Sequence, residues 1–409
     1  MYLYYYYKMS ITESEVVETS CKKEGDMDPS FKIKSWDELE INSKLLRGIY
    51  AYGFENPSPI QQQAIKPLIM GRDIVIQAQS GTGKTATFAV GALANLDTTD
   101  NSTQVLVLSP TKELTIQTAK VFESLGSMME ELRVQTLYGG SIVVEGNNFS
   151  NKKIPHVICG CPGKVFDMMR RNKISCSKIK LVILDEADEM LSSGFKEQVY
   201  NIFQYFNNNI QVALVSATLP ESINTIIDKI MRNPIRVSVK REMLTLEGIS
   251  QHYVAVDDDR QKYATLKDLY GFISMSQSII YCNSVKRVQD LYEAMKDDDF
   301  SVCRIHSNME KNERAESFND FKSGVSRVLI SSNVTARGID IQQVSIVVNF
   351  DLPKCVNTYL HRIGRSGRWG RKGVGINLIT RRDVMKLKEI EQHYSTQITE
   401  MPGNLDFLK

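Results

Sequence analysis

At 409 residues the chain is longer than a single ordinary domain, so its length predicts two or three domains. Hydrophobic residues make up 42% and charged residues 24%, as in ordinary globular proteins, and no apolar run is long enough to predict a membrane-spanning helix. The formal net charge is only +2. Any polyanionic partner must therefore be held by specifically placed residues and not by a basic tail.

The N-terminal stretch MYLYYYYKM is aromatic, not aliphatic, and no small-residue cleavage site follows it. We therefore do not expect a signal peptide, and Met9 offers an alternative start. Residues 1–35 show no apolar periodicity and are predicted to form a flexible N-terminal tail.

The seven cysteines are an odd number and include no Cys-x-x-Cys pair. This pattern indicates reduced thiols in an intracellular protein of the cytoplasm, the nucleus or both, with metal binding as the weaker alternative.

Beyond the tail, short β-branched runs alternate with helical patterns in two series. Because these runs are apolar throughout, they are typical of strands in parallel sheets that helices cover on both faces. The sequence therefore predicts an α/β protein with two tandem doubly wound domains, at 36–239 and 249–409, joined by a short linker at 240–248. The predicted strands are 72–78, 104–110, 156–162, 180–185, 211–217 and 235–239, then 250–256, 277–282, 302–306, 327–332, 345–351 and 373–379.

The first predicted strand runs into AQSGTGKTATF (78–88), which is rich in glycine and continues as a helical pattern. Its glycines permit a tight turn in which backbone N–H groups face phosphate oxygens at a helix N-terminus. Lys84 adds a charge for the β- and γ-phosphates, and the Thr85 hydroxyl is a ligand for Mg²⁺. A glycine turn followed by a chance Lys-Thr is the alternative. The strand before it and the helix after it favour a P-loop that binds nucleotide phosphates through Ser80, Gly81, Thr82, Gly83, Lys84 and Thr85, which the resemblance described below implies to be those of ATP.

The stretch LVILDEADEM (181–190) carries four acids at the end of a predicted buried strand. In P-loop enzymes a carboxylate at a second strand end completes the Mg²⁺ site, and Asp185 is the candidate for that role. Glu186 is the candidate general base that orients and deprotonates an attacking water. A solvated strand end with acids at a helix start is the alternative, which the P-loop upstream makes the weaker one.

The DEAD tetrapeptide at 185–188, together with the P-loop, resembles the DEAD-box ATP-dependent RNA helicases, and the likeness runs from about Trp36 to the C-terminus. It is strongest to the translation initiation factor 4A family, including its exon-junction and ribosome-biogenesis relatives. The resemblance implies two RecA-like domains that close over ATP and single-stranded RNA. The stretches that carry it are LLRGIYAYGFENPSPIQQQAI (45–65), LTLEGI (244–249), HRIGRSGR (361–368) and YSTQITEMP (394–402).

The resemblance also implies an adenine site. Phe54 would stack on the base, and the Gln61 amide would pair with its edge, since an amide offers both a donor and an acceptor. An ordinary core aromatic is the alternative for Phe54. Trp36 stands where the family has an isolated Phe and should keep its packing role, and Asp340 would contact the ribose.

Further implied residues connect the ATP site to the second domain. Ser216 and Thr218 would contact Asp188 and form a coupling motif, to which His361 would link; an ordinary strand-end turn is the alternative for the Ser-Ala-Thr run. In HRIGRSGR (361–368), a solvated basic surface is the alternative to two arginine fingers that reach the γ-phosphate when the domains close. These fingers would be Arg365 and Arg368.

The RNA contacts implied by the resemblance go mainly to phosphates and 2′-hydroxyls, so binding should be independent of sequence. Several positions depart from the family pattern: Lys112 and Lys164 replace Arg, Cys161 replaces Thr, Lys311 replaces Gln, Ser307-Asn308 replaces Gly-Asp and Ser332-Asn333 replaces Thr-Asp. A fast-evolving lineage with compensated contacts is the favoured explanation, and a specialised paralogue with weaker RNA affinity is the other. The implied RNA-binding residues are Pro110, Thr111, Lys112, Gly140, Gly163, Lys164, Arg314 and Ser332.

The sequence therefore predicts a monomeric RNA-stimulated ATPase that uses ATP and Mg²⁺ to unwind short duplexes in translation initiation or RNA processing. Expected protein partners are of the initiation-factor-scaffold or exon-junction type, and no membrane is involved. The alternative function is an ATP-gated RNA clamp whose turnover partners control. An inactive scaffold is disfavoured because the catalytic residues are present, and a DNA motor because the motifs resemble RNA-specific ones.

Overall fold

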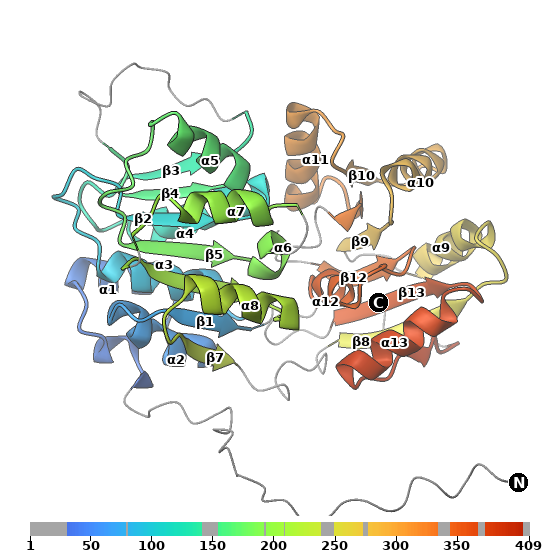
Figure 1. Ribbon diagram of the computed structural model, residues 1–409. Coiled ribbons are helices and arrows are strands. Elements are labelled where there is room, and N and C mark those ends of the chain that lie inside the picture. The colour runs from blue at the N-terminus through green and yellow to red at the C-terminus, as the bar shows by residue number, and fades with distance from the viewer. Residues whose placement is uncertain are drawn as a thin grey trace, which may run out of the picture.

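The computed structural model describes residues 31–78, 81–140, 154–191, 194–207, 209–238, 249–272, 277–333, 344–366 and 373–403. It has two lobes (Figure 1), each built on a seven-stranded parallel sheet flanked by helices. The predicted α/β class and the two tandem doubly wound domains are confirmed. The predicted linker at 240–248 lies outside the described residues.

The first sheet has the strand order β3-β4-β2-β5-β6-β1-β7. Its strands are β1 (Ile74–Gln77), β2 (Val105–Leu108), β3 (Val134–Leu137), β4 (Val157–Gly160), β5 (Leu181–Asp185), β6 (Gln211–Ser216) and β7 (Ile235–Ser238). The surrounding helices are η2 (Trp36–Glu38), α1 (Ser43–Ala51), α2 (Pro59–Ile69), α3 (Lys84–Ala94), α4 (Lys112–Leu125), α5 (Pro162–Arg170), α6 (Ala187–Leu191), α7 (Lys196–Phe203) and α8 (Glu221–Ile230).

The second sheet has the order β10-β11-β9-β12-β13-β8-β14. Its strands are β8 (Ile249–Ala255), β9 (Gln277–Tyr281), β10 (Val302–Ile305), β11 (Val328–Ser331), β12 (Val344–Asn349), β13 (Gly373–Ile379) and β14 (Thr399–Glu400). Its helices are α9 (Gln261–Phe272), α10 (Val285–Asp297), α11 (Lys311–Ser323), α12 (Val356–Ile363) and α13 (Val384–Tyr394).

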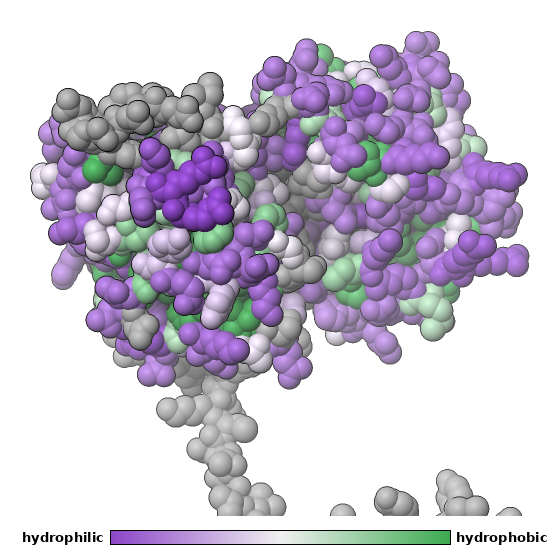
Figure 2. Space-filling model, turned by 45° about the horizontal axis from the view of Figure 1, so that its top comes forward, coloured by the Kyte–Doolittle hydropathy of each residue, from purple (hydrophilic) through white to green (hydrophobic). Residues whose placement is uncertain are grey.

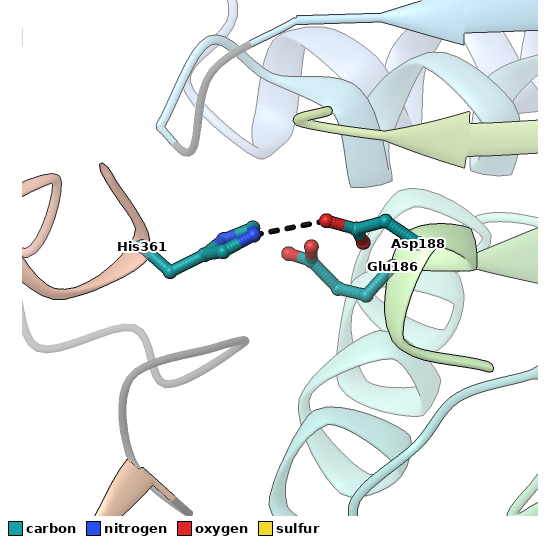
Figure 3. A group of neighbouring side chains, drawn as sticks. All are labelled: Glu186, Asp188 and His361. Atoms are coloured by element: carbon teal, nitrogen blue, oxygen red, sulfur yellow. Dashed lines mark hydrogen bonds and ion pairs between the residues drawn. The ribbon is translucent and has the colours of Figure 1, made fainter. Parts of the chain in front are cut away.

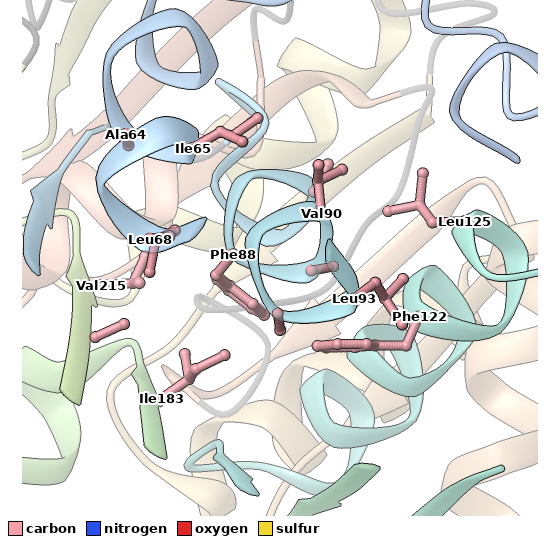
Figure 4. Packing of buried hydrophobic residues seen from close by; sticks show 14 of the residues in the cluster. Ala64, Ile65, Leu68, Phe88, Val90, Leu93, Phe122, Leu125, Ile183 and Val215 are labelled. Atoms are coloured by element: carbon pink, nitrogen blue, oxygen red, sulfur yellow. The ribbon is translucent and has the colours of Figure 1, made fainter. Parts of the chain in front are cut away.

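Helix α3 is the best-buried helix of the first lobe and follows the P-loop directly. Its small residues allow close packing: a Cβ on Gly91 would lie 2.7 Å from Leu68 on α2. Figure 4 shows its aromatic Phe88 between the aliphatic side chains of α2, the strand residues Ile183 and Val215, and Phe122 of α4. This dense packing holds the N-terminus of α3, and with it the P-loop, in a fixed position over the sheet.

All the predicted strands are present, but two further strands were not predicted. Both β3 and β14 lie at a sheet edge, where β3 is only partly buried and both residues of β14 are exposed. An edge strand does not need a continuous apolar sequence, which explains the two omissions.

One local prediction needs correction, and the cysteines can now be placed. The first domain begins before Trp36, because the Ile33 side chain is only 1% exposed and its backbone N–H donates to the carbonyl oxygen of Gln62. Cys161 lies one residue past β4, at the N-cap of α5, whereas Cys159 is buried within that strand. None of the six cysteines in the described residues forms a disulfide.

The surface in Figure 2 is largely hydrophilic, with hydrophobic side chains gathered only in small groups. Over the described part of the chain, every helix is too short or too polar to cross a membrane.

Candidate nucleotide-binding and catalytic site

The predicted ATP-site segments meet at one edge of the first sheet. The P-loop follows β1, the acidic run ends β5, and the Ser-Ala-Thr segment ends β6. These strands are neighbours in the order β5-β6-β1 and run parallel, so their carboxyl ends lie together. In open α/β sheets such an edge is where ligands bind.

The P-loop has the backbone of an anion-binding turn. Gly81 and Gly83 have φ of 84° and 94°, in the left-handed region that glycine adopts at little cost. Lys84 opens α3 and is 6% exposed, and its Nζ donates to the Ala78 carbonyl oxygen at 2.7 Å. The Ser58 hydroxyl donates to the carbonyl oxygen of Thr82 at 2.9 Å and ties the loop to α2. Ser80 lies outside the described residues.

The predicted adenine residues lie beside this loop. The Gln61 Oε1 accepts from the backbone N–H of Ser58 at 2.7 Å, and a Cβ on Gly83 would lie 2.8 Å from Gln61 Nε2. The half-buried Phe54 ring stacks on the fully buried Trp36, with centroids 6.1 Å apart and an interplanar angle of 21°. Tyr52 meets Phe54 edge-on at 4.8 Å. The buried Trp36 ring thus packs against the Phe54 ring and restricts its orientation, which agrees with the packing role predicted for Trp36.

The three motif acids are buried, with Asp185, Glu186 and Asp188 exposed by 2%, 4% and 5%. The Asp185 Oδ1 accepts from the backbone N–H of Glu186 at 3.0 Å. Burial raises the pKa of Asp185 to about 7; the charge of Glu186 adds to this rise, and that of Lys84 opposes it. Glu186 itself has a φ of 52°, a left-handed conformation that is uncommon outside glycine and is found at functional sites.

The acid pair fits a hard cation. Asp185 Oδ2 and Glu186 Oε2 are buried and have no hydrogen-bond partner among the described residues. Unpaired buried carboxylate oxygens are costly. Together with a hydroxyl such as that of Thr85, in the first turn of α3, they are the donor type that Mg²⁺ prefers.

The coupling residues bring the two lobes together at Asp188 (Figure 3). Its Oδ2 accepts from the Thr218 hydroxyl at 2.6 Å and lies 2.9 Å from Nε2 of His361, which comes from α12 of the second lobe. The Ser216 hydroxyl accepts from the backbone N–H of Asp188 at 3.4 Å and donates to the Thr218 carbonyl oxygen at 2.7 Å. One carboxylate oxygen of Glu186, one of Asp188 and one ring nitrogen of His361 also lie within 4.8 Å of one another, as the ligands of a metal ion would. Since Asp188 and His361 already pair directly, we interpret this group as an interdomain contact.

The helix that supplies His361 also leads to the predicted fingers. Arg365 is 4% exposed, and its Nε donates to the carbonyl oxygen of His361 at 3.2 Å. The hydrogen bond to the last turn of α12 thus fixes the position of the Arg365 side chain. Arg368 and Asp340 lie outside the described residues.

The predicted RNA contacts of the first lobe lie at the ends of the adjacent strands β3, β4 and β2, beside the ATP half of the same sheet edge. Thr111 follows Pro110 and caps α4, accepting from the backbone N–H of Leu114 at 3.3 Å. The Lys112 ammonium lies 5.2 Å from the centre of the Tyr138 ring. Gly140, with φ 79°, follows β3, and Gly163 and the half-buried Lys164 open α5. A Cβ on Gly163 would meet nothing within 4 Å, so its backbone is open to a ligand.

The second lobe contributes two predicted RNA residues. Ser332 follows β11, and its backbone N–H donates to the Ile305 carbonyl oxygen at 3.3 Å. Arg314 on α11 pairs across the lobes with Glu113 on α4, with Nη2 and Oε2 2.9 Å apart. An RNA role for Arg314 must therefore coexist with this interdomain ion pair.

Sequence reasoning did not identify Glu113, Ser58 or the buried Arg362. Glu113 lies in the stretch PTKELT (110–115), which contains the predicted RNA-binding residues Pro110, Thr111 and Lys112. Its place in this stretch was the only sequence feature that could have marked it as functional. The four partners of Arg362 are scattered over three segments of the chain, and nothing in the sequence associates them.

A P-loop, paired strand-end carboxylates and a buried contact between two RecA-like lobes define a nucleotide-hydrolysing motor of the two-domain helicase class. The comparisons agree: DEAD/DEAH box helicase matches residues 58–226, and the helicase conserved C-terminal domain matches residues 261–370. The chain belongs to the DEAD/DEAH box helicase family, and it is an ATP-dependent RNA helicase.

Its relatives include eukaryotic initiation factor 4A of Caenorhabditis elegans, 46% identical over 398 residues and covering 97% of this chain and 98% of the relative. The ATP-dependent RNA helicase eIF4A of Saccharomyces cerevisiae is 48% identical over 373 residues, covering 91% and 94%. Among solved structures, S. cerevisiae Dbp5 bound to RNA and ADP BeF3 has a TM-score of 0.83 at 36% identity, covering 90% of this chain and 95% of that one.

Proposed function

We propose that this helicase binds single-stranded RNA through its backbone and unwinds short duplexes during translation initiation. The observation that carries the proposal is the buried meeting of Asp188 with Thr218 and His361. Asp188 lies two residues after Glu186, the proposed general base, at the start of helix α6. The contact of Asp188 with His361 thus connects the proposed general base to the second lobe. The proposed role in translation initiation rests on the initiation factor relatives, which are 46% and 48% identical to this chain.

In the proposed mechanism Lys84 would hold the β- and γ-phosphates, and Thr85 and Asp185 would hold Mg²⁺. The ion would supply positive charge to the phosphate oxygens. Glu186 accepts a proton from the attacking water and is the general base. Arg365 and Arg368 stabilise the charge that develops on the transferring phosphoryl group, which makes both lobes necessary for turnover.

We infer that the two lobes are arranged as in a closed enzyme, and the similarity to Dbp5 supports this inference. Dbp5 bound to RNA and ADP BeF3 matches with a TM-score of 0.83, whereas Dbp5 bound to Nup159, Gle1, IP6 and ADP matches with 0.62. In the closed form bent RNA would span the ends of β2, β3 and β4 and the residues after β11, and hydrolysis would release it.

The second candidate function is an ATP-gated RNA clamp, in which protein partners hold the lobes closed and suppress turnover. The two interdomain contacts, at Asp188 and at Glu113, favour it because they stabilise closure without nucleotide chemistry. We propose that the chain acts as a monomer in the cytoplasm, the nucleus or both, with a partner of the initiation-factor-scaffold or exon-junction type.

The test is ATP turnover of the purified chain with Mg²⁺, with and without single-stranded RNA, beside Glu186→Gln. We expect RNA to stimulate the wild type, EDTA to abolish turnover, and Glu186→Gln to lower kcat at least about 100-fold while ATP still binds. An unstimulated wild type that holds RNA stably in the presence of ATP would instead support the clamp. Normal hydrolysis by Glu186→Gln would exclude Glu186 as the base.

A further inference from the structure

Arg362 is a fully buried arginine whose side chain is satisfied by neutral oxygens alone. It lies in the last turn of α12, directly between His361 and the helix end that leads to Arg365. Nε and Nη2 both donate to Asn333 Oδ1, at 3.0 and 2.6 Å. The remaining N–H groups donate to Asn349 Oδ1 (3.0 Å), Asn283 Oδ1 (2.8 Å) and the Asp351 carbonyl oxygen (2.7 Å).

The cage around Arg362 comes from three neighbouring strands. Asn333, Asn283 and Asn349 stand at the carboxyl ends of β11, β9 and β12, which are adjacent in the sheet. Two of the amides are oriented by their own donors: Asn349 Nδ2 donates to Asn377 Oδ1, and Asn283 Nδ2 donates to the Leu352 carbonyl oxygen. Their oxygens therefore face the guanidinium, and the helix end is fixed to the sheet at three points.

The carboxylate of Asp351 forms ion pairs with Arg287 and Lys262 and not with Arg362. The Asp351 side chain pairs with Arg287 at 2.8 Å and lies 3.6 Å from Lys262, and it accepts from the backbone N–H of Asn283 at 3.0 Å. Arg362 receives only the Asp351 carbonyl oxygen. Burial lowers the pKa of Arg362 to about 10, so the group remains charged at neutral pH. Its positive charge is thus buried and has no carboxylate of the described residues in direct contact.

We propose that Asn333 is a positioning residue that completes the cage of Arg362 while leaving its positive charge uncancelled. A charge in a poorly screened interior acts over a longer range than a surface charge. Because α12 supplies His361 to the closed interface, the uncancelled charge draws the second lobe towards the ATP phosphates held by the first. Asn333 therefore sets how strongly ATP closes the enzyme. This inference rests on the proposed function, in which ATP hydrolysis follows closure.

Asn333 allows the charge and the position to be separated by substitution. Asn333→Asp keeps the accepting oxygen but adds a negative charge, and since residue 333 is exposed, the new carboxylate will be ionised. Asn333→Leu removes the acceptor altogether. The matched control is Asn224→Asp, because Asn224 on α8 of the first lobe also accepts from an arginine, Arg236, at 3.1 Å. It adds the same charge to the chain on a helix of the first lobe, outside the cage of Arg362.

The experiment measures ATP turnover of the full chain with poly(U) RNA, and thermal unfolding, for all three variants. We expect Asn333→Asp to raise Tm by about 3 °C and to raise the KM for ATP at least threefold. Asn333→Leu should lower kcat at least tenfold, and Asn224→Asp should match the wild type. A smaller KM rise in Asn333→Asp, or an equal kcat in Asn333→Leu and Asn333→Asp, overturns the proposal. Wild-type and Asn224→Asp turnover test the proposed function separately, because neither changes the cage.

Discussion

His306 is the residue whose environment most directly predicts a pH effect on stability. It follows β10, is 2% exposed, and neither ring nitrogen has a hydrogen-bond partner among the described residues. Burial lowers its pKa below the ordinary 6.5, and the charges of Arg304 and Arg314 lower it further, whereas that of Glu313 opposes them. The folded protein thus keeps His306 neutral at a pH at which the unfolded chain binds a proton.

The sign of the effect follows from this difference in proton binding. Below about pH 6.5 the unfolded chain binds the proton and the folded chain does not, so the free energy of unfolding falls as the pH falls. Between pH 7.5 and pH 5.5 we expect the free energy of unfolding to fall less in His306→Leu than in the wild type, as measured by thermal or urea unfolding. His393→Leu is the control, since His393 is exposed. An equal pH dependence in His306→Leu and wild type would contradict the prediction.

At the scale of elements, the turn between β1 and α3 is the place where we predict that phosphate binds. Gly83 has a φ of 94°, and a Cβ there would lie 2.8 Å from the Gln61 amide nitrogen. Gly83→Ala therefore meets both backbone strain and a clash with a predicted adenine residue. We expect it to weaken ATP affinity at least about tenfold, as measured by calorimetric titration.

The control, Gly324→Ala, introduces the same kind of backbone strain as Gly83→Ala but no clash of the new side chain. Gly324 ends α11 with a φ of 82°, but a Cβ there would meet nothing within 4 Å. Gly324→Ala should lower stability by about 1 kcal/mol through strain alone and leave ATP affinity unchanged. If Gly83→Ala and Gly324→Ala bind ATP equally well, the P-loop geometry is not what limits binding.

At the scale of the whole molecule, the ion pair between Glu113 and Arg314 joins the predicted RNA-binding sides of the two lobes. Its atoms are 2.9 Å apart, and the side chains are only 14% and 20% exposed, so screening is weaker than at a surface. Glu113→Arg or Arg314→Glu alone should lower the RNA-stimulated kcat about tenfold, since a like-charged pair opposes closure. The double variant should recover to within about threefold of the wild type.

This charge exchange also tests the predicted RNA role of Arg314. If Arg314 mainly contacts RNA, the double variant will stay as impaired as Arg314→Glu, because glutamate repels phosphate. The surface pair Lys44 and Glu130 lies within the first lobe at the same 2.9 Å and is far more exposed. Exchanging those two charges should change kcat by less than about twofold.

Much of this protein is determined by local sequence. The P-loop, the acidic strand end and the buried strands are contiguous patterns, and their chemistry follows from residue type and spacing, as Lys84 and Asp185 illustrate. The edge strands β3 and β14 were not predictable, because a strand with an exposed side lacks the continuous apolar signal.

The tertiary structure decided how distant residues meet. The family resemblance implied that His361 links to the coupling motif of Asp188. The pair of Glu113 with Arg314 came from the tertiary structure alone, because it depends on how the two sheets face each other and no local pattern records that orientation. The cage of Arg362 depends on strand order, since only the adjacency of β11, β9 and β12 brings its asparagines together. Sequence thus set the chemistry available at each strand end, and packing decided which groups act together, because burial and pairing energies depend on distances that only the folded chain defines.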